Sequence, residues 1–508
     1  MIRKMVLTSL MFFAIGSTLM AADISGAWYY ERTAANGRKT EGYYVFKADG
    51  NKFTGRSITS RSREEIVNGV VDGNQISFDV KSWQPTGKPA AYKGTLNEDE
   101  LRFTQAQVPQ KGQPQETILK RVSPSTEFNP PPSLAALMPQ HKPLPPFKPI
   151  KSNGLAKIPP MGWNSWNKFH AAIDDKTVRE IADAMVSSGM KDAGYVYLNI
   201  DDTWEGKRDA NGNILTNERF PDMKALADYV HAKGLKIGIY SGPGRTTCQG
   251  LEASYMHEEQ DAKSFAAWGI DYLKYDWCSA SAVFDAAEMP AAYQKMALAL
   301  RATGRPIIYS LCQYGWLDVG KWGADAGGNL WRTTGDISDR WASMSNIGFG
   351  QNGREIYAAP GHWNDPDMLE IGNGAMTAAE YRTHMSLWCM LAAPLLAGND
   401  LRKMTPETIE ILTNKEVIAI DQDKLGRQGA RVKQDGELEI WKKPLAGGVA
   451  VALFNRSAAA AKMTVRWADL GIKKNPKVRD LWAHTDVQAH AEYSVEVPSH
   501  GVVMLRVK

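Results

Sequence analysis

The segment YLKYDWC, residues 272–278, carries three side chains capable of chemistry at alternate positions. Alternate side chains of a β-strand lie on the same face, so Lys274, Asp276 and Cys278 are expected to share one face of a strand. A cation, a carboxylate and a sulfur are costly to bury together in a core, but they are useful at the opening of a cavity. We therefore predict that this strand ends at a functional site.

Polar and aromatic residues also follow other strand-like segments. They include aspartates, tryptophans and an arginine but no pair of histidines, which argues against metal-dependent hydrolysis and against a Ser/His/Asp triad. Tryptophan faces stack on sugar rings and carboxylates accept hydrogen bonds from hydroxyl groups, so the set indicates a carbohydrate site with two carboxylates acting at the glycosidic carbon. The residues at these strand ends are Trp163, Trp166, Asp201, Asp202, Trp204, Tyr240, Lys274, Asp276, Cys278, Cys312, Gln313, Trp316, Arg332, Asp336, Asn364, Asp365 and Asp367.

Each of these residues also has an ordinary structural explanation. A lone Asp at a strand end is commonly a helix N-cap or a turn former, Asp201 and Asp202 could be a capping pair, and Lys274 could be a structural ion-pair partner. A functional site is favoured because five or more successive strand ends present side chains suited to the same ligand.

The elements that must position these residues repeat as strand, loop and helix from about residue 158. The strand ends recur about every 35–40 residues, which is the size of a βα unit. Many successive units favour a central (β/α)8 TIM barrel, in which functional residues gather at the carboxyl ends of the strands. The expected strands lie at 195–201, 235–241, 271–276, 306–312, 329–336, 354–368 and 394–400.

The segments before and after this region have the shorter alternating pattern of antiparallel sheets. Period-2 runs broken by ADGN, DGN and NEDE predict a small N-terminal all-β module, either a sandwich or a barrel, and similar runs near the end predict a C-terminal antiparallel β-sandwich. The predicted segments are a signal peptide at 1–22, an N-terminal β module at 23–125, a Pro-rich linker at 126–156, the catalytic barrel at 157–424 and the C-terminal β-sandwich at 425–508.

Composition limits the function classes. The chain has 508 residues with 60 Lys and Arg against 56 Asp and Glu, a balance that gives no argument for nucleic acid or a membrane surface as a partner. Arg3 and Lys4, an apolar run and then Ala21 and Ala22 are typical of a secretory signal peptide, so we expect an exported protein, periplasmic or secreted.

Four cysteines are present in the sequence. Export permits a disulfide, and Cys248 and Cys278 are the better candidates for a pair because both follow strand-like segments. Cys312 and Cys389 lie in apolar surroundings and are expected to be free thiols in the core.

Taken together, these motifs resemble those of a known family. PPMGWNSWN, YLNIDDTW, IGIYS, YLKYDWC, SLCQYGW, WRTTGDI and HWNDPDML are similar to the motifs of glycoside hydrolase family 27, the α-galactosidases (melibiases) and their relatives. The resemblance covers residues 157 to about 508 and does not include the N-terminal module or the linker. It implies a retaining exo-glycosidase that removes terminal α-linked D-galactose from oligosaccharides or polysaccharides by double displacement, without a cofactor or metal.

The resemblance also implies roles for individual residues. Asp276 matches the nucleophile, which must stay ionised, and the nearby Lys274 is expected to lower its pKa. Asp336 matches the general acid/base and must begin protonated. Cys248 and Cys278 match a disulfide beside the pocket. The residues expected to form the galactose pocket are Trp166, Asp201, Asp202, Tyr240, Cys248, Lys274, Cys278, Gln313, Trp316, Arg332, Asp367 and Met368.

Departures from the family's motifs bear on specificity. Where many members have Cys-Glu-Trp or Cys-Asn-Trp, this chain has Cys312-Gln313-Tyr314, which leaves the contacts to the sugar's 2-position open. Gln313 and Trp316 are too bulky for an acetamide group, which argues against an α-N-acetylgalactosaminidase. Asp202 is shorter than the acid of β-L-arabinopyranosidases and leaves room for the hydroxymethyl group of galactose. Those two activities are the alternatives within the family, and a carbohydrate-binding protein without catalysis is the alternative outside it.

Overall fold

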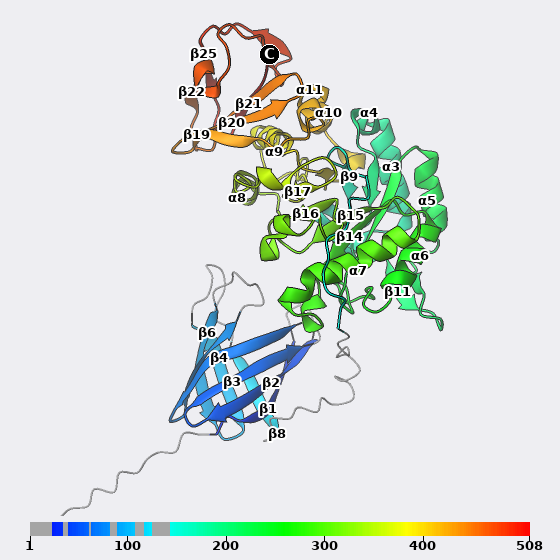
Figure 1. Cartoon of the computed structure of the whole chain (residues 1–508), viewed down its shortest axis with the longest axis vertical. Helices are drawn as coiled ribbons and strands as arrows, with labels where there is room; N and C mark the ends of the chain where they lie inside the picture. Colours follow the sequence, from blue (N-terminus) through cyan, green and yellow to red (C-terminus); the bar gives the residue numbers. More distant parts are fainter. Residues whose placement is uncertain (1–22, 34–38, 60–61, 82–88, 107–115, 124–142) are drawn as a thin grey trace, which may run out of the picture. The chain divides into compact units, whose positions relative to one another are not determined.

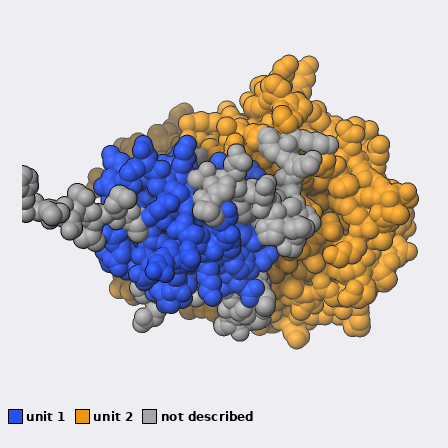
Figure 2. All heavy atoms as spheres, turned by 90° about the horizontal axis from the view of Figure 1, so that it is seen from below, with its two compact units in different colours: residues 1–83, 87–137 blue, residues 84–86, 138–508 orange. Residues whose placement is uncertain are grey.

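The computed structural model describes residues 23–33, 39–59, 62–81, 89–106, 116–123 and 143–508. The predicted signal peptide and residues 126–142 of the predicted linker lie outside these ranges. The chain divides into two compact units, which Figure 2 colours separately. Unit 1 consists of residues 1–83 and 87–137, and unit 2 consists of residues 84–86 and 138–508.

Unit 1 is an antiparallel barrel (Figure 1). Each strand pairs with the next in sequence and β8 pairs with β1, so the sheet closes on itself. Gly50 and Gly73 have positive φ in two-residue loops between paired strands, which is the hairpin chemistry that the DGN motifs predict. The strands are β1 (Gly26–Thr33), β2 (Lys39–Asp49), β3 (Lys52–Thr59), β4 (Arg63–Asp72), β5 (Gln75–Lys81), β6 (Ala90–Asn97), β7 (Glu100–Gln105) and β8 (Thr117–Ser123).

The centre of unit 2 is a sheet of eight parallel strands, in which β9 to β17 lie side by side in sequence order and the last strand, β18, pairs with β9. The chain beyond β17 reaches the opposite edge, where Leu369 bridges to Ala397 of β18, so the two edges are linked as in a (β/α)8 barrel. The strands are β9 (Met161–Asn164), β10 (Tyr197–Asn199), β13 (Lys236–Ser241), β14 (Tyr272–Asp276), β15 (Ile308–Cys312), β16 (Leu330–Arg332), β17 (Trp363–Asp365) and β18 (Leu395–Ala397).

Helices lie between successive strands, and several of them bury an apolar face. In α3, for example, Asp174 caps the first turn by accepting a hydrogen bond from the Thr177 amide, and Val178, Ile181 and Met185 recur at helical spacing on the buried face. The helices are α2 (Trp166–Phe169), α3 (Asp175–Ser187), α4 (Met190–Ala193), α5 (Met223–Ala232), α6 (Glu258–Trp268), α7 (Met289–Ala302), α8 (Trp341–Phe349), α9 (Ala378–Leu391), α10 (Pro406–Thr413) and α11 (Lys415–Asp421). A short hairpin, β11 (Glu205–Arg208) and β12 (Ile214–Thr216), follows β10.

The C-terminal part of unit 2 has two antiparallel sheets around one core, as a sandwich requires. Apolar residues from both sheets, such as Val451 and Val465, pack in that core. Helix α9 lies against the sandwich, since Lys443 Nζ donates to the Cys389 carbonyl at 2.6 Å. The strands are β19 (Ala430–Asp435), β20 (Leu438–Leu445), β21 (Gly448–Asn455), β22 (Ala461–Arg466), β23 (Val478–Asp480), β24 (Thr485–Val487), β25 (Glu492–Val497) and β26 (Val502–Val507).

Residues 148–153, which the sequence assigns to a linker, are part of unit 2. The Ile150 amide donates to the Asp325 carbonyl at 3.0 Å, and Asn153 and Asn329 exchange two side-chain hydrogen bonds of 2.9 and 2.8 Å. These residues are therefore fixed to the parallel-strand domain. In the part of the chain that the structure describes, no helix combines the length and apolar character needed to cross a bilayer.

Candidate active site

A cavity of about 200 Å³ opens at the carboxyl ends of the parallel strands. It is smaller than the ~300–1,000 Å³ typical of sites for drug-sized ligands, and its size suits one sugar ring. Five aspartates and two cations line it, a balance that favours hydroxyl groups over an anionic ligand. Its lining residues are Trp166, Asn167, Asp201, Asp202, Tyr240, Cys248, Gln249, Lys274, Asp276, Tyr314, Arg332, Asp336, Asp367 and Met368.

The first carboxylate pair follows β10. Asp201 Oδ2 accepts hydrogen bonds from Lys274 Nζ and Asn164 Nδ2, each at 2.8 Å. Burial lowers the pKa of Lys274, but the neighbouring groups, of which Asp201 has the largest effect, together outweigh burial and hold this pKa well above its ordinary value. Lys274 is therefore a fixed cation on the cavity wall.

Asp202 is buried beside this pair, and its Oδ2 accepts from the Gln249 amide at 2.9 Å. Its Oδ1 has no hydrogen-bond partner within the described residues. Burial raises the pKa of Asp202 to about 6, although the hydrogen bonds that it accepts act in the opposite direction. The free oxygen makes Asp202 a ready acceptor for a ligand hydroxyl group.

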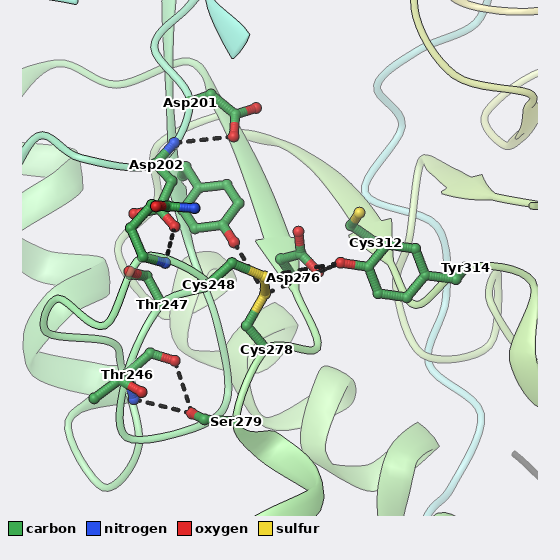
Figure 3. Close-up of a disulfide and its surroundings, with 12 residues drawn as sticks. Asp201, Asp202, Thr246, Thr247, Cys248, Asp276, Cys278, Ser279, Cys312 and Tyr314 are labelled. Atoms are coloured by element: carbon green, nitrogen blue, oxygen red, sulfur yellow. Dashed lines mark hydrogen bonds between the residues drawn. A yellow bond between two sulfur atoms is a disulfide. The ribbon is translucent and has the colours of Figure 1, made fainter. Parts of the chain in front are cut away.

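Asp276 is the last residue of β14 and is only 5% exposed. Its Oδ1 accepts a hydrogen bond of 2.7 Å from Tyr314 Oη (Figure 3). Burial raises the pKa of Asp276, while the Lys274 charge and the Tyr314 hydrogen bond lower it without cancelling the effect of burial. The expected influence of Lys274 is thus present, but the expectation of a lowered pKa is wrong because desolvation is the larger effect.

Arg332 joins two aspartates on the other side of the cavity. Its Nη2 lies 3.0 Å from Asp336 Oδ1 and 2.8 Å from Asp367 Oδ2. Asp367 is buried and also accepts from the Ile337 and Met368 amides, whereas the side chain of Asp336 is 70% exposed. Asp336 therefore lies at the solvent side of the cavity and Asp276 at the closed side.

A disulfide joins Cys248 to Cys278 beside Asp276, as predicted (Figure 3). Tyr240 Oη lies 3.4 Å from Cys278 Sγ, and Ser279 Oγ bonds both the amide and the carbonyl of Thr246. The loops after β13 and β14 are thereby fixed to each other. Cys312 and Cys389 are free and buried, also as predicted.

The positive backbone angle of Tyr314 explains why two predicted residues after β15 do not line the cavity. Gln313 is fully buried and its Oε1 accepts from the Gly315 amide at 3.1 Å, so this side chain stabilises a turn. Tyr314 has φ of 59°, and its ring enters the cavity in place of Gln313 and Trp316. The assignment of Gln313 and Trp316 to the binding surface is therefore corrected. Cys278 also lies outside the lining and acts through its bond to Cys248.

Three lining residues are not predicted from the sequence: Asn167, Gln249 and Tyr314. Asn167 follows a predicted residue by one position, and Gln249 follows the disulfide cysteine, so proximity to the motifs is the signal that could have identified them. Other strand-end residues have structural roles instead: the indoles of Trp163 and Trp204 donate to the Asn399 and Tyr240 carbonyls.

One group of metal-ligating residue types lies close together in the described part of the chain, namely Cys248, Asp276 and Cys278. Both sulfurs are committed to the disulfide, so they cannot act as thiolate ligands. The group therefore does not form a metal site in the oxidised protein.

Comparisons with known proteins agree with this geometry. A family model described as "Alpha galactosidase A" matches residues 158–423, and one described as "Alpha galactosidase C-terminal beta sandwich domain" matches residues 435–507. The α-galactosidase of Cyamopsis tetragonoloba is 50% identical over 363 residues, which cover 70% of this chain and 87% of that protein.

Solved structures show the same likeness. α-Galactosidase I from Mortierella vinacea aligns with a TM-score of 0.67 at 37% identity, covering 70% of this chain and 98% of that one. A putative α-galactosidase from Bacteroides fragilis aligns with a TM-score of 0.67 at 34% identity and covers 86% of this chain and 91% of that one.

Proposed function

The chain belongs to the α-galactosidase family, glycoside hydrolase family 27, and hydrolyses α-galactosides; we propose that it does so by a retaining double displacement with Asp276 as nucleophile and Asp336 as general acid/base. The supporting observation is that both carboxyl groups line one cavity in contrasting environments. Asp276 is buried and held by a hydrogen bond, whereas Asp336 faces solvent on the side where a leaving group and water can enter.

The two chemical steps follow from these positions. Asp276 attacks the anomeric carbon while Asp336 gives its proton to the departing glycosidic oxygen, so a galactosyl ester forms on Asp276 and the alcohol leaves. Asp336, now a carboxylate, then takes a proton from water as the water oxygen attacks the same carbon. The bond to Asp276 breaks, its electrons return to the carboxylate, and galactose is released with its original configuration.

Fixed polar groups around Asp276 would bind the hydroxyl groups of one terminal galactose. The Lys274–Asp201 pair and the Arg332–Asp367 pair present charged donors and acceptors, and Asp202 offers its free oxygen. Trp166 lines the same cavity and supplies an aromatic surface for the ring. We propose galactose over arabinopyranose because the short side chain of Asp202 leaves space for the hydroxymethyl group.

The mechanism is tested with Asp276→Ala and a p-nitrophenyl α-galactoside. We expect turnover to be abolished, and azide to restore part of it by attacking from the vacated face, giving the β-galactosyl azide. Asp228→Ala, on the exposed side of α5, is the control and should retain wild-type activity. Near wild-type turnover of Asp276→Ala would remove Asp276 from the nucleophile's role.

Substrate class is tested by assaying p-nitrophenyl α-galactoside, β-L-arabinopyranoside and α-N-acetylgalactosaminide side by side. We expect the α-galactoside to have the highest kcat/KM. A higher value for either of the other substrates would overturn the proposed preference for galactose.

We also propose that the protein is exported and acts on terminal α-linked galactose of oligosaccharides or polysaccharides outside the cytoplasm. The charged, apolar and small-residue pattern of residues 1–22 supports cleavage as a signal peptide. The Cys248–Cys278 disulfide is typical of an oxidising compartment. The mass of the mature protein isolated from its native host tests the cleavage.

A further inference from the structure

Tyr314 places its hydroxyl group at a junction of the active site. Its Oη lies 2.7 Å from Asp276 Oδ1 and 3.9 and 4.0 Å from the two sulfurs of the Cys248–Cys278 disulfide (Figure 3). The ring lines the cavity, so the phenol is enclosed between the carboxylate and the disulfide.

The backbone is shaped to bring this hydroxyl group to Asp276. Tyr314 and Gly315 have φ of 59° and 82°, so two consecutive left-handed residues follow β15 after Gln313. A Cβ at position 315 would lie 2.2 Å from the Thr333 carbonyl oxygen, so only glycine fits there. A left-handed conformation is unfavourable for a bulky residue such as tyrosine, and such strain is found where it serves a site.

We infer that Tyr314 is a positioning residue for the nucleophile: it holds Oδ1 of Asp276, turns Oδ2 toward the anomeric carbon, and stabilises the negative charge of the carboxylate. The inference rests on the proposed role of Asp276. Burial raises the pKa of the Tyr314 phenol far above its ordinary range, so the phenol stays protonated and acts as a donor throughout the reaction.

The hydrogen bond has different consequences in the two chemical steps. In the galactosyl ester Oδ2 is bonded to the sugar and Oδ1 is the carbonyl oxygen, so the carboxyl group carries no net charge. When water attacks, the bond to Oδ2 breaks and negative charge returns to the carboxylate, where Tyr314 can stabilise it. Losing the donor must therefore slow breakdown of the ester. Its effect on ester formation is smaller, because negative charge leaves the carboxylate in that step.

Tyr314→Phe removes the hydroxyl group and keeps the ring. The hydrogen bond is made to a carboxylate that carries only partial charge in the transition state, so its loss predicts that the galactosyl-enzyme breaks down about tenfold more slowly. The pKa of Asp276 should rise, because its ionised form loses a donor, and the acid limb of the kcat/KM profile should move up by about one pH unit.

The experiment traps the ester with an activated fluorinated α-galactoside, identifies the labelled residue by peptide mass, and measures the reactivation rate. The matched control is Tyr229→Phe, which removes another Tyr–Asp hydrogen bond, that to Asp183 at 2.9 Å between α5 and α3, outside the cavity lining. We expect the control to keep the wild-type acid limb and reactivation rate. A purely structural role for Tyr314 would leave both readouts unchanged in Tyr314→Phe as well.

Two failures are distinguishable. If the wild-type label is not on Asp276, the proposed nucleophile is wrong, whatever Tyr314 does. The other failure is a label on Asp276 with an unchanged Tyr314→Phe. If its acid limb stays within about 0.2 pH unit of wild type and its reactivation rate within about twofold, which is the precision of such profiles, the role of Tyr314 is wrong. Should Tyr314→Phe not fold, 3-fluorotyrosine at position 314 keeps the hydroxyl as a stronger donor. It should shift the acid limb to lower pH and speed reactivation, and an unchanged profile overturns the inference.

Discussion

Replacing Asp202 by Asn should stabilise the protein at neutral pH while it impairs catalysis. Asp202 is 1% exposed, and burial raises the pKa of its carboxyl group to about 6 from an ordinary 3.8. Because the folded-state pKa is raised, the folded protein binds this proton more tightly than the unfolded chain. Its contribution to stability is therefore most favourable below pH 3.8 and is lost as the pH rises through about 6.

The difference between these two pKa values corresponds to about 3 kcal/mol of unfavourable free energy above pH 6. An Asn side chain is neutral at every pH and can still accept the hydrogen bond from the Gln249 amide. The unfolding free energy of Asp202→Asn relative to wild type should therefore increase by about 2–3 kcal/mol from pH 4 to pH 8. The same change should lower kcat/KM about 10- to 100-fold, since a charged acceptor for a sugar hydroxyl group is lost.

Urea unfolding of both proteins at pH 4 and pH 8 measures the stability change, and other titrating groups cancel because they are common to both proteins. Asp228→Asn, on the exposed side of α5 and paired with Lys224, is the control and should show no such dependence. If the stability difference between Asp202→Asn and wild type does not grow with pH, ionisation of the buried Asp202 does not destabilise the folded protein. The electrostatic reasoning is then refuted.

Two further predictions concern the scaffold. Removing residues 1–142 should leave activity on small α-galactosides within about twofold of wild type. Removing residues 1–156 should also lower the thermal midpoint of unfolding, because Ile150 and Asn153 form hydrogen bonds within unit 2. Equal thermal midpoints of the two truncated proteins would contradict this prediction. Replacing Cys248 and Cys278 together by Ala should lower the unfolding free energy by about 3–4 kcal/mol, the value for a disulfide with a sequence separation of 30. It should also reduce kcat/KM, because the loop beside Asp276 is no longer fixed. An unchanged urea midpoint would show that this disulfide does not constrain the unfolded chain.

The sequence is most informative where a regular period ties a residue to an element. Alternation in YLKYDWC correctly directs Lys274 and Asp276 to the cavity, and Leu273 and Tyr275 away from it, because a strand allows only two faces. Repeated βα units likewise predict that distant strand ends meet at one edge, which is why Asp201, Asp276 and Asp367 line one cavity.

Positions set by irregular backbone are not predictable in this way. Gln313 is expected to face the sugar because it follows β15, but the left-handed turn at Tyr314 exchanges the two side chains.

The direction of the net pKa shift of Asp276 could not be predicted from the sequence for a different reason. It depends on how strongly burial opposes the Lys274 charge, and the depth of burial is a property of the folded cavity. The N-terminal sheet is ambiguous too, because sandwich and barrel share the same alternation and differ in which strands pair, here in one closed sheet with β8 on β1.

The active site concentrates features that cost stability. Tyr314 and Asp367 are non-glycine residues with positive φ, and burial raises the pKa values of Asp202 and Asp276, so this cavity holds carboxylates that would be better solvated elsewhere. Lys274 and Arg332 offset part of that cost by pairing with aspartates, and the Cys248–Cys278 disulfide joins the loops after β13 and β14 beside Asp276. A substitution that relieves one of these strains, such as Asp202→Asn, should therefore raise stability and lower activity together. Substitutions of equal chemistry outside the cavity should change neither.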